Sequence, residues 1–234
     1  MLRLQPVTES VFYFESSMAT SKSDPKPFAL QPPQQERSRA SFERVLTAGA
    51  ALLEEEGYDG FTLAGVSSRA KVSIGSIYAR VKSKDDLFYV IQDRYMSESE
   101  AMPAFATDPD SYSRLATKEL IVQVVHDVGE LFQANSALLR VFMHRGIVDH
   151  VVAERSSKSV SGFAAAFEKL LLTRRSEIVQ ADPDLAVDVA FRIAWGTLAR
   201  QIMYWPTFES EHRIEFDRLV DELCTVLVAY LLDG

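Results

Sequence analysis

The sequence predicts an all-α protein, in which three short helices with helix-turn-helix spacing precede a larger helical bundle. Two observations lead to this fold class. Apolar residues recur at helical spacing from Arg37 onward, and no segment shows the apolar/polar alternation typical of a strand. Two short helical patterns also follow one another closely, each opened by a cap residue, which is the arrangement of a helix-turn-helix.

Composition divides the chain into three parts. Residues 1–36 are rich in Ser, Pro and Gln and are expected to form a disordered leader, within which Met18 is an alternative start. Residues 37–97 form the first expected domain, with the helix-turn-helix at about 62–81. Residues 98–234 form the second, a helical domain.

Charge is distributed unevenly over these parts. Of the formal net charge of −8, all lies in residues 98–234, which hold 13 basic and 21 acidic residues, whereas residues 60–84 contain five basic side chains and no acid. A local basic face on an acidic protein indicates a polyanionic partner held at one end. No run of about 18 apolar residues is available for a membrane span. A single cysteine, Cys224, excludes an intrachain disulfide and fits a reducing cytoplasm.

Cap signals order the elements of the first domain. The first helix should run from Arg37 and stop at Gly57. Thr62 can cap a second helix whose inner positions are Leu63, Val66 and Ala70, and Ser73 can cap a third. Ser83 and Asp86 have the spacing of a capping box, which opens a longer helix expected to end near Pro103.

The second domain shows several apolar stripes at helical spacing. Three of them are Leu120, Val124, Val128, Leu131 and Phe132, then Leu138, Leu139, Phe142 and Met143, then Phe163, Phe167, Leu170 and Leu171. Two long helical patterns follow, the first starting at Pro183, and a short link containing Pro206 joins them. This is typical of an antiparallel helical pair.

The third helix has the side chains that a DNA-reading helix needs. Small residues allow close approach, serine hydroxyls reach bases or phosphates, Ile74 suits a thymine methyl, and Tyr78 and Lys84 suit the phosphate backbone. The predicted DNA contacts are Thr62, Lys71, Ser73, Ile74, Gly75, Ser76, Tyr78, Arg80, Lys82 and Lys84.

Residues 62–88, TLAGVSSRAKVSIGSIYARVKSKDDLF, resemble the DNA-binding signature of the TetR (tetracycline-repressor) family without a gap. The matching positions are Thr62, Val66, Ala70, Val72, Ser73, Gly75, Tyr78, Lys84 and Leu87. The departures are Lys71, where the family usually has glycine in the turn, Arg80 in place of a frequent histidine, and Val81 in place of phenylalanine. A lysine held at positive φ would cost on the order of 1 kcal/mol.

The resemblance implies two sites in the second domain. One is an apolar pocket for a small molecule, for which the expected residues are Phe132, Phe142, Met143, Phe163, Phe167 and Trp195. The other is a two-fold dimer interface formed by the last two helices, for which they are Phe191, Leu198, Leu219, Leu223, Val226, Leu227 and Tyr230.

These observations predict a cytoplasmic, homodimeric transcriptional regulator, and we expect a repressor that an apolar effector releases from a palindromic operator on double-stranded DNA. The alternative is a helical ligand-sensing or interaction module without specific DNA binding. No catalytic constellation, metal-ligand spacing or phosphate loop is present in the sequence, so we expect neither an enzyme nor a cofactor.

Overall fold

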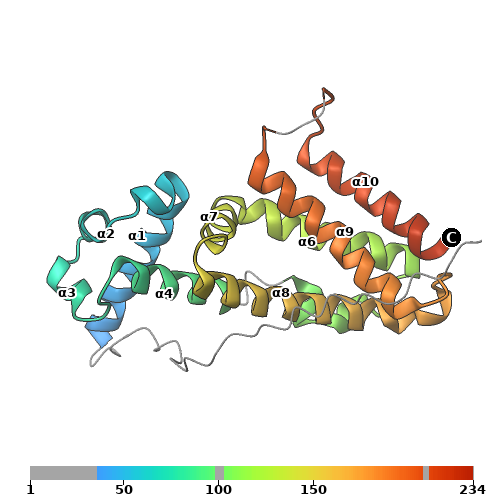
Figure 1. The fold of residues 1–234 in the computed structure, drawn as a ribbon. Coiled ribbons are helices and arrows are strands. Elements are labelled where there is room, and N and C mark those ends of the chain that lie inside the picture. The colour runs from blue at the N-terminus through green and yellow to red at the C-terminus, as the bar shows by residue number, and fades with distance from the viewer. Residues whose placement is uncertain (1–35, 98–102, 208–210, 234) are drawn as a thin grey trace, which may run out of the picture.

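The structure, a computed structural model, describes residues 36–97, 103–207 and 211–233, and within these ranges it contains helices and no strand (Figure 1). The all-α prediction is confirmed. The predicted leader, up to residue 35, lies outside the described residues, and so does the segment before Pro103 in which the fourth helix was expected to end. The α-helices are α1 (Glu36–Gly60), α2 (Leu63–Ala70), α3 (Ile74–Tyr78), α4 (Lys84–Ser97), α5 (Ala104–Thr107), α6 (Thr117–Ala134), α7 (Ser136–Gly146), α8 (His150–Leu171), α9 (Pro183–Tyr204) and α10 (Phe216–Val228).

Three short elements accompany these helices among the described residues. They are the 3-10 segments η2 (Pro109–Tyr112) and η3 (Leu172–Glu177), and a final π-helical turn, η4 (Ala229–Asp233). Figure 1 shows α1, α2 and α3 at one end of the molecule, with α4 leading from them to the bundle formed by α6 to α10. None of the described helices combines the length and the apolar character needed to cross a membrane.

Local chemistry sets the boundaries of the first helices as predicted. Gly57 interrupts α1 with φ 68° and ψ −172°, a conformation that glycine adopts without a steric penalty. The Thr62 side chain caps α2 by accepting a hydrogen bond from Gly65 N at 3.0 Å, and Ser73 caps α3 by accepting one from Ser76 N at 3.3 Å. The buried residues of α2 are those predicted for it.

The turn between α2 and α3 depends on a lysine in the left-handed region. Lys71 has φ 54° and ψ 43°, the only positive φ among the described non-glycine residues. Its N–H donates to Ser68 O and the N–H of Val72 donates to Ser67 O, which is the Schellman pattern that normally uses glycine at this position. The turn therefore keeps the backbone of the glycine form, and Lys71 bears the conformational cost.

The capping box at α4 is also confirmed. Asp86 N donates to Ser83 Oγ at 3.0 Å, and the Asp86 carboxylate in return accepts from Ser83 N at 3.0 Å. Two acidic side chains, Asp85 and Asp86, lie in the first turn of α4, where they interact favourably with the helix dipole. This fixes the direction in which α4 leaves the helix-turn-helix.

In the second half of the chain, α10 packs chiefly against α6 rather than against its sequence neighbour α9, so the predicted antiparallel pairing of the last two helices is only a minor contact. Gly129 of α6 permits this packing. A Cβ added there would lie 2.9 Å from Val220 Cγ2 of α10, closer than a methyl group can approach. The large C-terminal core therefore lies between α6, α8, α9 and α10.

The two halves of the molecule share side chains. Leu138 and Phe142 of α7 and Val152 of α8 belong to the same buried cluster as the residues of α1, α2 and α4. The ring of Phe142 lies edge-on to Phe88 of α4, with centroids 5.6 Å apart. A boundary drawn at residue 97 therefore separates residues that pack in one core.

Candidate DNA-binding face and ligand cavity

The α3 helix presents almost all of its surface outward. Ile77 is its one buried residue, whereas Ile74 is 42% and Tyr78 53% exposed. Folding alone gives no reason to expose a large aliphatic and a large aromatic side chain on one five-residue helix. Both belong to the predicted DNA contacts, and their exposure leaves them available to a partner.

The N-terminal end of α3 is open and polar. The Oγ atoms of Ser73 and Ser76 lie 2.8 Å apart and both residues are exposed. A Cβ built on Gly75 would meet no atom of the protein within 4 Å, and Gly75 has no positive φ. The protein itself therefore does not need glycine at this position, whereas a partner surface that approaches the helix closely would benefit from it.

The basic side chains around α3 differ in their availability. Lys71 and Lys82 are exposed. Arg69, by contrast, forms a hydrogen-bonded ion pair with Glu55 of α1, with Nη1 at 2.6 Å from Oε2. This bond holds the pKa of the Glu55 carboxyl below its ordinary value. Glu55 of α1 thus neutralises one of the five basic side chains in the acid-free stretch of residues 60–84. Thr62, also a predicted DNA contact, is exposed and already uses its hydroxyl as a cap.

Arg80 differs most from its predicted surface role. Its side chain is only 8% exposed, Nη2 donates to Ser38 O at 2.9 Å, and the guanidinium lies 4.9 Å from the centre of the Phe42 ring. Arg80 also lines a groove between α1 and α3 beside Ser76, and its Nη1 has no hydrogen-bond partner among the described residues. The structure therefore gives Arg80 a role in joining α3 to α1, and its phosphate contact stays a prediction.

Lys84 is engaged at the junction of the two halves. Its Nζ lies 4.1 Å from the centre of the Tyr58 ring, and the guanidinium of Arg145, from α7, lies 4.0 Å from the same centre. The Tyr58 hydroxyl donates to the carboxylate of Asp85. A ring held by two cations and a carboxylate fixes the end of α1 against α4 and α7. We call Tyr58, Lys84, Asp85 and Arg145 the junction cluster.

A second group of contacts extends the junction cluster to α8. Tyr89 of α4 donates to Asp149 Oδ2 at 2.9 Å, and Arg145 Nη2 lies 3.2 Å from the same oxygen. Burial alone would raise the pKa of the Asp149 carboxyl, but its bonds from Tyr89, the Val152 N–H and Arg145 outweigh burial and lower it. Burial and the bond to Asp149 raise the pKa of Tyr89 to about 12. Asp149 is therefore a charged acceptor that ties α4 to the start of α8.

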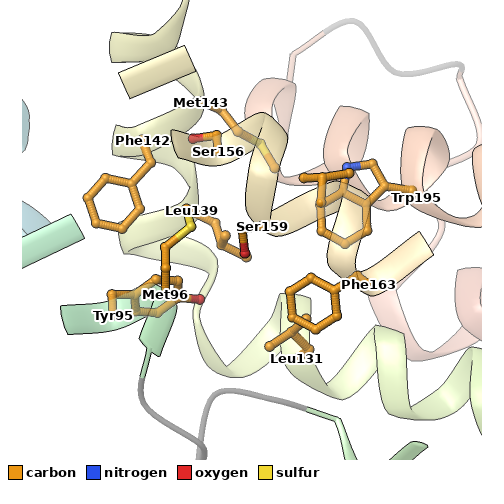
Figure 2. Close-up of a pocket in the computed structure, with 11 residues that line it drawn as sticks. Tyr95, Met96, Leu131, Leu139, Phe142, Met143, Ser156, Ser159, Phe163 and Trp195 are labelled. Carbon is orange, nitrogen blue, oxygen red and sulfur yellow. The ribbon is translucent and has the colours of Figure 1, made fainter. Parts of the chain in front are cut away.

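A cavity of about 130 Å³ lies between α4, α6, α7, α8 and α9 (Figure 2). The side chains that line it are Tyr95, Met96, Leu131, Leu139, Phe142, Met143, Ser156, Ser159, Val160, Phe163 and Trp195. Figure 2 shows the rings of Trp195 and Phe163 on one side, with Tyr95 and Met96 of α4 opposite them. The cavity is therefore mostly apolar and touches α4, the helix that leads to the predicted DNA-binding end.

Four of the six predicted pocket residues line this cavity: Phe142, Met143, Phe163 and Trp195. The other two do not. Phe132 is fully buried behind Trp195, with ring centroids 4.8 Å apart, and Phe167 is fully buried against Phe105 and Phe191. Both are core residues, because their rings face other aromatic side chains instead of the empty space.

The predicted interface residues also divide into two groups. Phe191, Leu198, Leu223 and Leu227 are between 0 and 6% exposed within the single chain, so they pack inside the protomer and cannot offer a dimer surface. By contrast, Val226 is 50% exposed, and Leu219 and Tyr230 are partly exposed. The apolar stripe of the last helices is thus mostly used to cover α6 and α9.

The described residues contain no group of three or more His, Cys, Asp or Glu side chains placed to hold a metal ion. Cys224 is 5% exposed, and burial raises the pKa of its thiol to about 11. A protonated, enclosed thiol is a structural side chain and a poor nucleophile.

Comparison with known proteins identifies the family. Residues 45–90 match the family model for bacterial regulatory proteins of the tetR family, and residues 118–231 match the model of the tetracyclin repressor-like C-terminal domain. The chain belongs to the TetR family. The matched residues include the helix-turn-helix and the cavity-lining residues other than Tyr95 and Met96, and a TetR-family protein of this organisation is a DNA-binding transcription regulator.

Individual relatives are distant. The A-factor receptor protein of Streptomyces griseus is 24% identical over 168 residues, which is 64% of this chain and 60% of that protein, so the match spans less than two thirds of the relative. A Mesorhizobium loti protein described as a TetR-family transcriptional regulator has a TM-score of 0.62 at 17% identity, over 84% of this chain and 97% of that one.

FadR from Bacillus subtilis, solved in complex with stearoyl-CoA, has a TM-score of 0.60 at 17% identity, over 81% of this chain and 99% of that one. At these identities the two solved structures support the fold alone.

Proposed function

We propose that this TetR-family chain is a dimeric repressor that binds a palindromic operator through α3 and leaves it when a small molecule occupies the cavity. The observation that carries the proposal is the outward-facing surface of α3, with Ile74 and Tyr78 exposed beside an open Gly75. Those two side chains are among the exposed large hydrophobic residues of the described chain, and they suit the major groove.

The DNA contacts divide by chemistry. Ile74 and Ser76 at the start of α3 would meet base edges, because they are exposed at the end of the helix that enters the groove first. Tyr78, Lys71 and Lys82 would contact the phosphate backbone without reading sequence.

Release would follow from contacts that the cavity shares with the DNA-binding end. Phe142 lines the cavity and also packs against Phe88, and Tyr95 lines it from α4 itself. A molecule that binds better when these side chains are displaced would favour a different orientation of α4 and hence of α3. A coupling free energy of about 1–3 kcal/mol would change operator affinity by about 5- to 150-fold.

Dimerisation would involve the surface around Val226, Leu219 and Tyr230, because these are the predicted interface residues that the protomer leaves exposed. A two-fold axis there would set two α3 helices one or more turns of DNA apart and would make the operator palindromic. We expect the protein to have no enzymatic activity, and we expect it to act in the cytoplasm.

The test is selection of bound sites from random double-stranded DNA by the purified full chain at near-physiological salt. An enriched palindrome is expected. Ile74→Ala should change the preferred bases, whereas Tyr78→Phe combined with Lys84→Ala should weaken binding to all sequences and flatten its salt dependence. Lys118→Ala, an exposed lysine on α6, is the matched control for lost charge.

Absence of any enriched sequence, with retention lost as salt rises, would contradict the proposal. The basic face would then bind only charge, and the chain would be a ligand-sensing module without an operator. Because Nζ of Lys84 already lies over the Tyr58 ring, we expect Tyr78 to account for the larger part of the lost affinity, whereas the change in salt dependence comes from Lys84, the one cation that the double variant removes.

A further inference from the structure

One buried hydroxyl in the cavity, that of Tyr95, has no hydrogen-bond partner among the described residues. Tyr95 packs its ring against Phe142, with centroids 5.4 Å apart, and its hydroxyl oxygen is buried without a hydrogen-bond partner among the described residues. A buried polar group left unpaired destabilises the fold, and phenylalanine would fill the same space without that cost. Burial raises the pKa of Tyr95, so the group stays a protonated donor at neutral pH.

Two serines of α8, Ser156 and Ser159, also line the cavity. Ser156 and Ser159 are three residues apart, which places them on one helix face. The Ser156 Oγ accepts a hydrogen bond from Gln92 Nε2 at 3.1 Å, so its own proton remains available for donation. Figure 2 shows the oxygens of Tyr95 and Ser159 pointing into the middle of the cavity. This end of the cavity therefore offers donor hydrogens.

The remainder of the wall excludes charge. None of the eleven lining side chains is ionisable at neutral pH, and the side opposite Tyr95 consists of Phe163 and Trp195, whose ring centroids lie 5.9 Å apart. An ionised carboxylate or phosphate placed among these rings would lose its hydration without gaining a cation. An uncharged molecule with an apolar or aromatic body fits instead.

The volume limits the size of the occupant. A cavity of about 130 Å³ is close to the 150 Å³ engineered cavity that holds benzene, so a compact group of roughly that size fills it. A long acyl chain would need the helices to move apart.

We infer that the cavity takes a compact, uncharged molecule whose carbonyl or ether oxygen accepts a hydrogen bond from the Tyr95 hydroxyl, with its apolar body against Phe163 and Trp195. The inference rests on the ligand-binding role proposed above and adds to it the chemical class of the ligand. Since Tyr95 lies on α4, the same hydrogen bond would be the contact through which the ligand acts on the DNA-binding end.

Three benzene derivatives of similar size distinguish the hydrogen bond, the apolar contact and the exclusion of charge. Acetophenone carries a carbonyl, ethylbenzene carries none, and benzoate carries a charge. Their dissociation constants would be measured on the full chain without DNA by ligand-observed NMR titration. Acetophenone should bind, and Tyr95→Phe should weaken it about tenfold, corresponding to about 1.4 kcal/mol. Ethylbenzene should bind the Tyr95→Phe variant at least as tightly as it binds the native chain. Benzoate should bind the native chain at least about tenfold more weakly than acetophenone does.

Tyr204→Phe, which removes the hydroxyl of an exposed tyrosine outside the cavity, is the matched control. Tyr95→Phe should keep or raise the melting temperature, because it removes an unpaired hydroxyl, so a binding loss cannot be ascribed to unfolding. Equal loss of both neutral probes would show that the hydroxyl does not select an acceptor. Tightest binding by benzoate, or no binding by any probe, would refute the ligand class.

The outcome is independent of operator binding. The titration contains no DNA, so a failed site selection leaves it unchanged. An enriched palindrome with no probe binding would refute only the ligand class.

Discussion

Replacing Lys71 with glycine should stabilise the free protein and weaken its binding to DNA. Lys71 occupies the left-handed region at φ 54°, which costs a side-chain-bearing residue about 1–2 kcal/mol. Glycine removes that cost, but its greater freedom in the unfolded chain returns about 0.4–1 kcal/mol. The expected net gain is about 0.7 kcal/mol, which raises the melting temperature by about 1.5–3 °C in a chain of this size.

A second variant, Lys71→Ala, separates the effect of the backbone conformation on stability from the effect of the ammonium charge on DNA binding. Alanine keeps the left-handed cost and loses the ammonium group, whereas glycine loses both, so the two variants should differ in stability by about 0.7 kcal/mol and agree in DNA affinity. Urea unfolding of both variants and of the native chain gives the first comparison. Operator binding at several salt concentrations gives the second, in which each lost phosphate contact lowers the salt slope by about 0.9 per protomer.

A glycine variant that is less stable than the alanine variant by about 0.4–1 kcal/mol would refute the reasoning, because the freedom of glycine in the unfolded chain would then be the whole difference and the turn would impose no cost on a side chain. If stability differed as expected but the salt slope stayed unchanged, Lys71 would be a strained residue without a phosphate contact. The conformational cost of Lys71 in the turn would then be confirmed, and its predicted phosphate contact would be wrong.

Three further substitutions and treatments test other parts of the structure. Gly129→Val should lower the free energy of unfolding by about 1–3 kcal/mol, because its side chain would overlap Val220, whereas Gly162→Val on the open face of α8 should change it little. Since the pKa of Asp149 is lowered in the folded chain, its charge stabilises the fold above the ordinary carboxyl pKa near 4, and this is lost as pH falls through the folded value. Asp149→Asn should therefore lower the urea midpoint at pH 7, and the difference should shrink below about pH 4; a constant difference would contradict the assignment. Cys224, whose pKa is raised to about 11, should react with a thiol reagent at pH 7 only after urea unfolding, and rapid labelling of the native chain would show that α10 opens.

The sequence was most informative where structure depends on near neighbours. Thr62, Ser73 and the Ser83–Asp86 box were predicted as caps because a cap needs only a side-chain oxygen and N–H groups within three residues. The caps therefore follow from residue type and spacing alone. The left-handed turn at Lys71, in contrast, was predicted from the family resemblance, because the family usually has glycine at that position.

Contacts between distant helices were harder to predict. Phe132 and Phe163 belong to similar apolar stripes, yet only Phe163 borders the cavity, because the position of a void depends on how five helices pack together. Leu223 and Leu227 show the same ambiguity, since an apolar stripe fits a partner chain and the protomer's own core equally well. Tyr95 was not among the predicted pocket residues, because the expected domain boundary at residue 97 placed it in the helix-turn-helix domain.

The α3 helix is attached to the rest of the protein almost entirely through Ile77 and its two ends. Its outward side chains contribute little to the core, so their replacement should alter what the protein recognises while leaving its melting temperature nearly unchanged. Related genes could thus acquire separate operators after duplication without passing through an unstable intermediate. The same separation makes the segment 73–78 a natural unit for exchange between regulators, with the sensing half left in place.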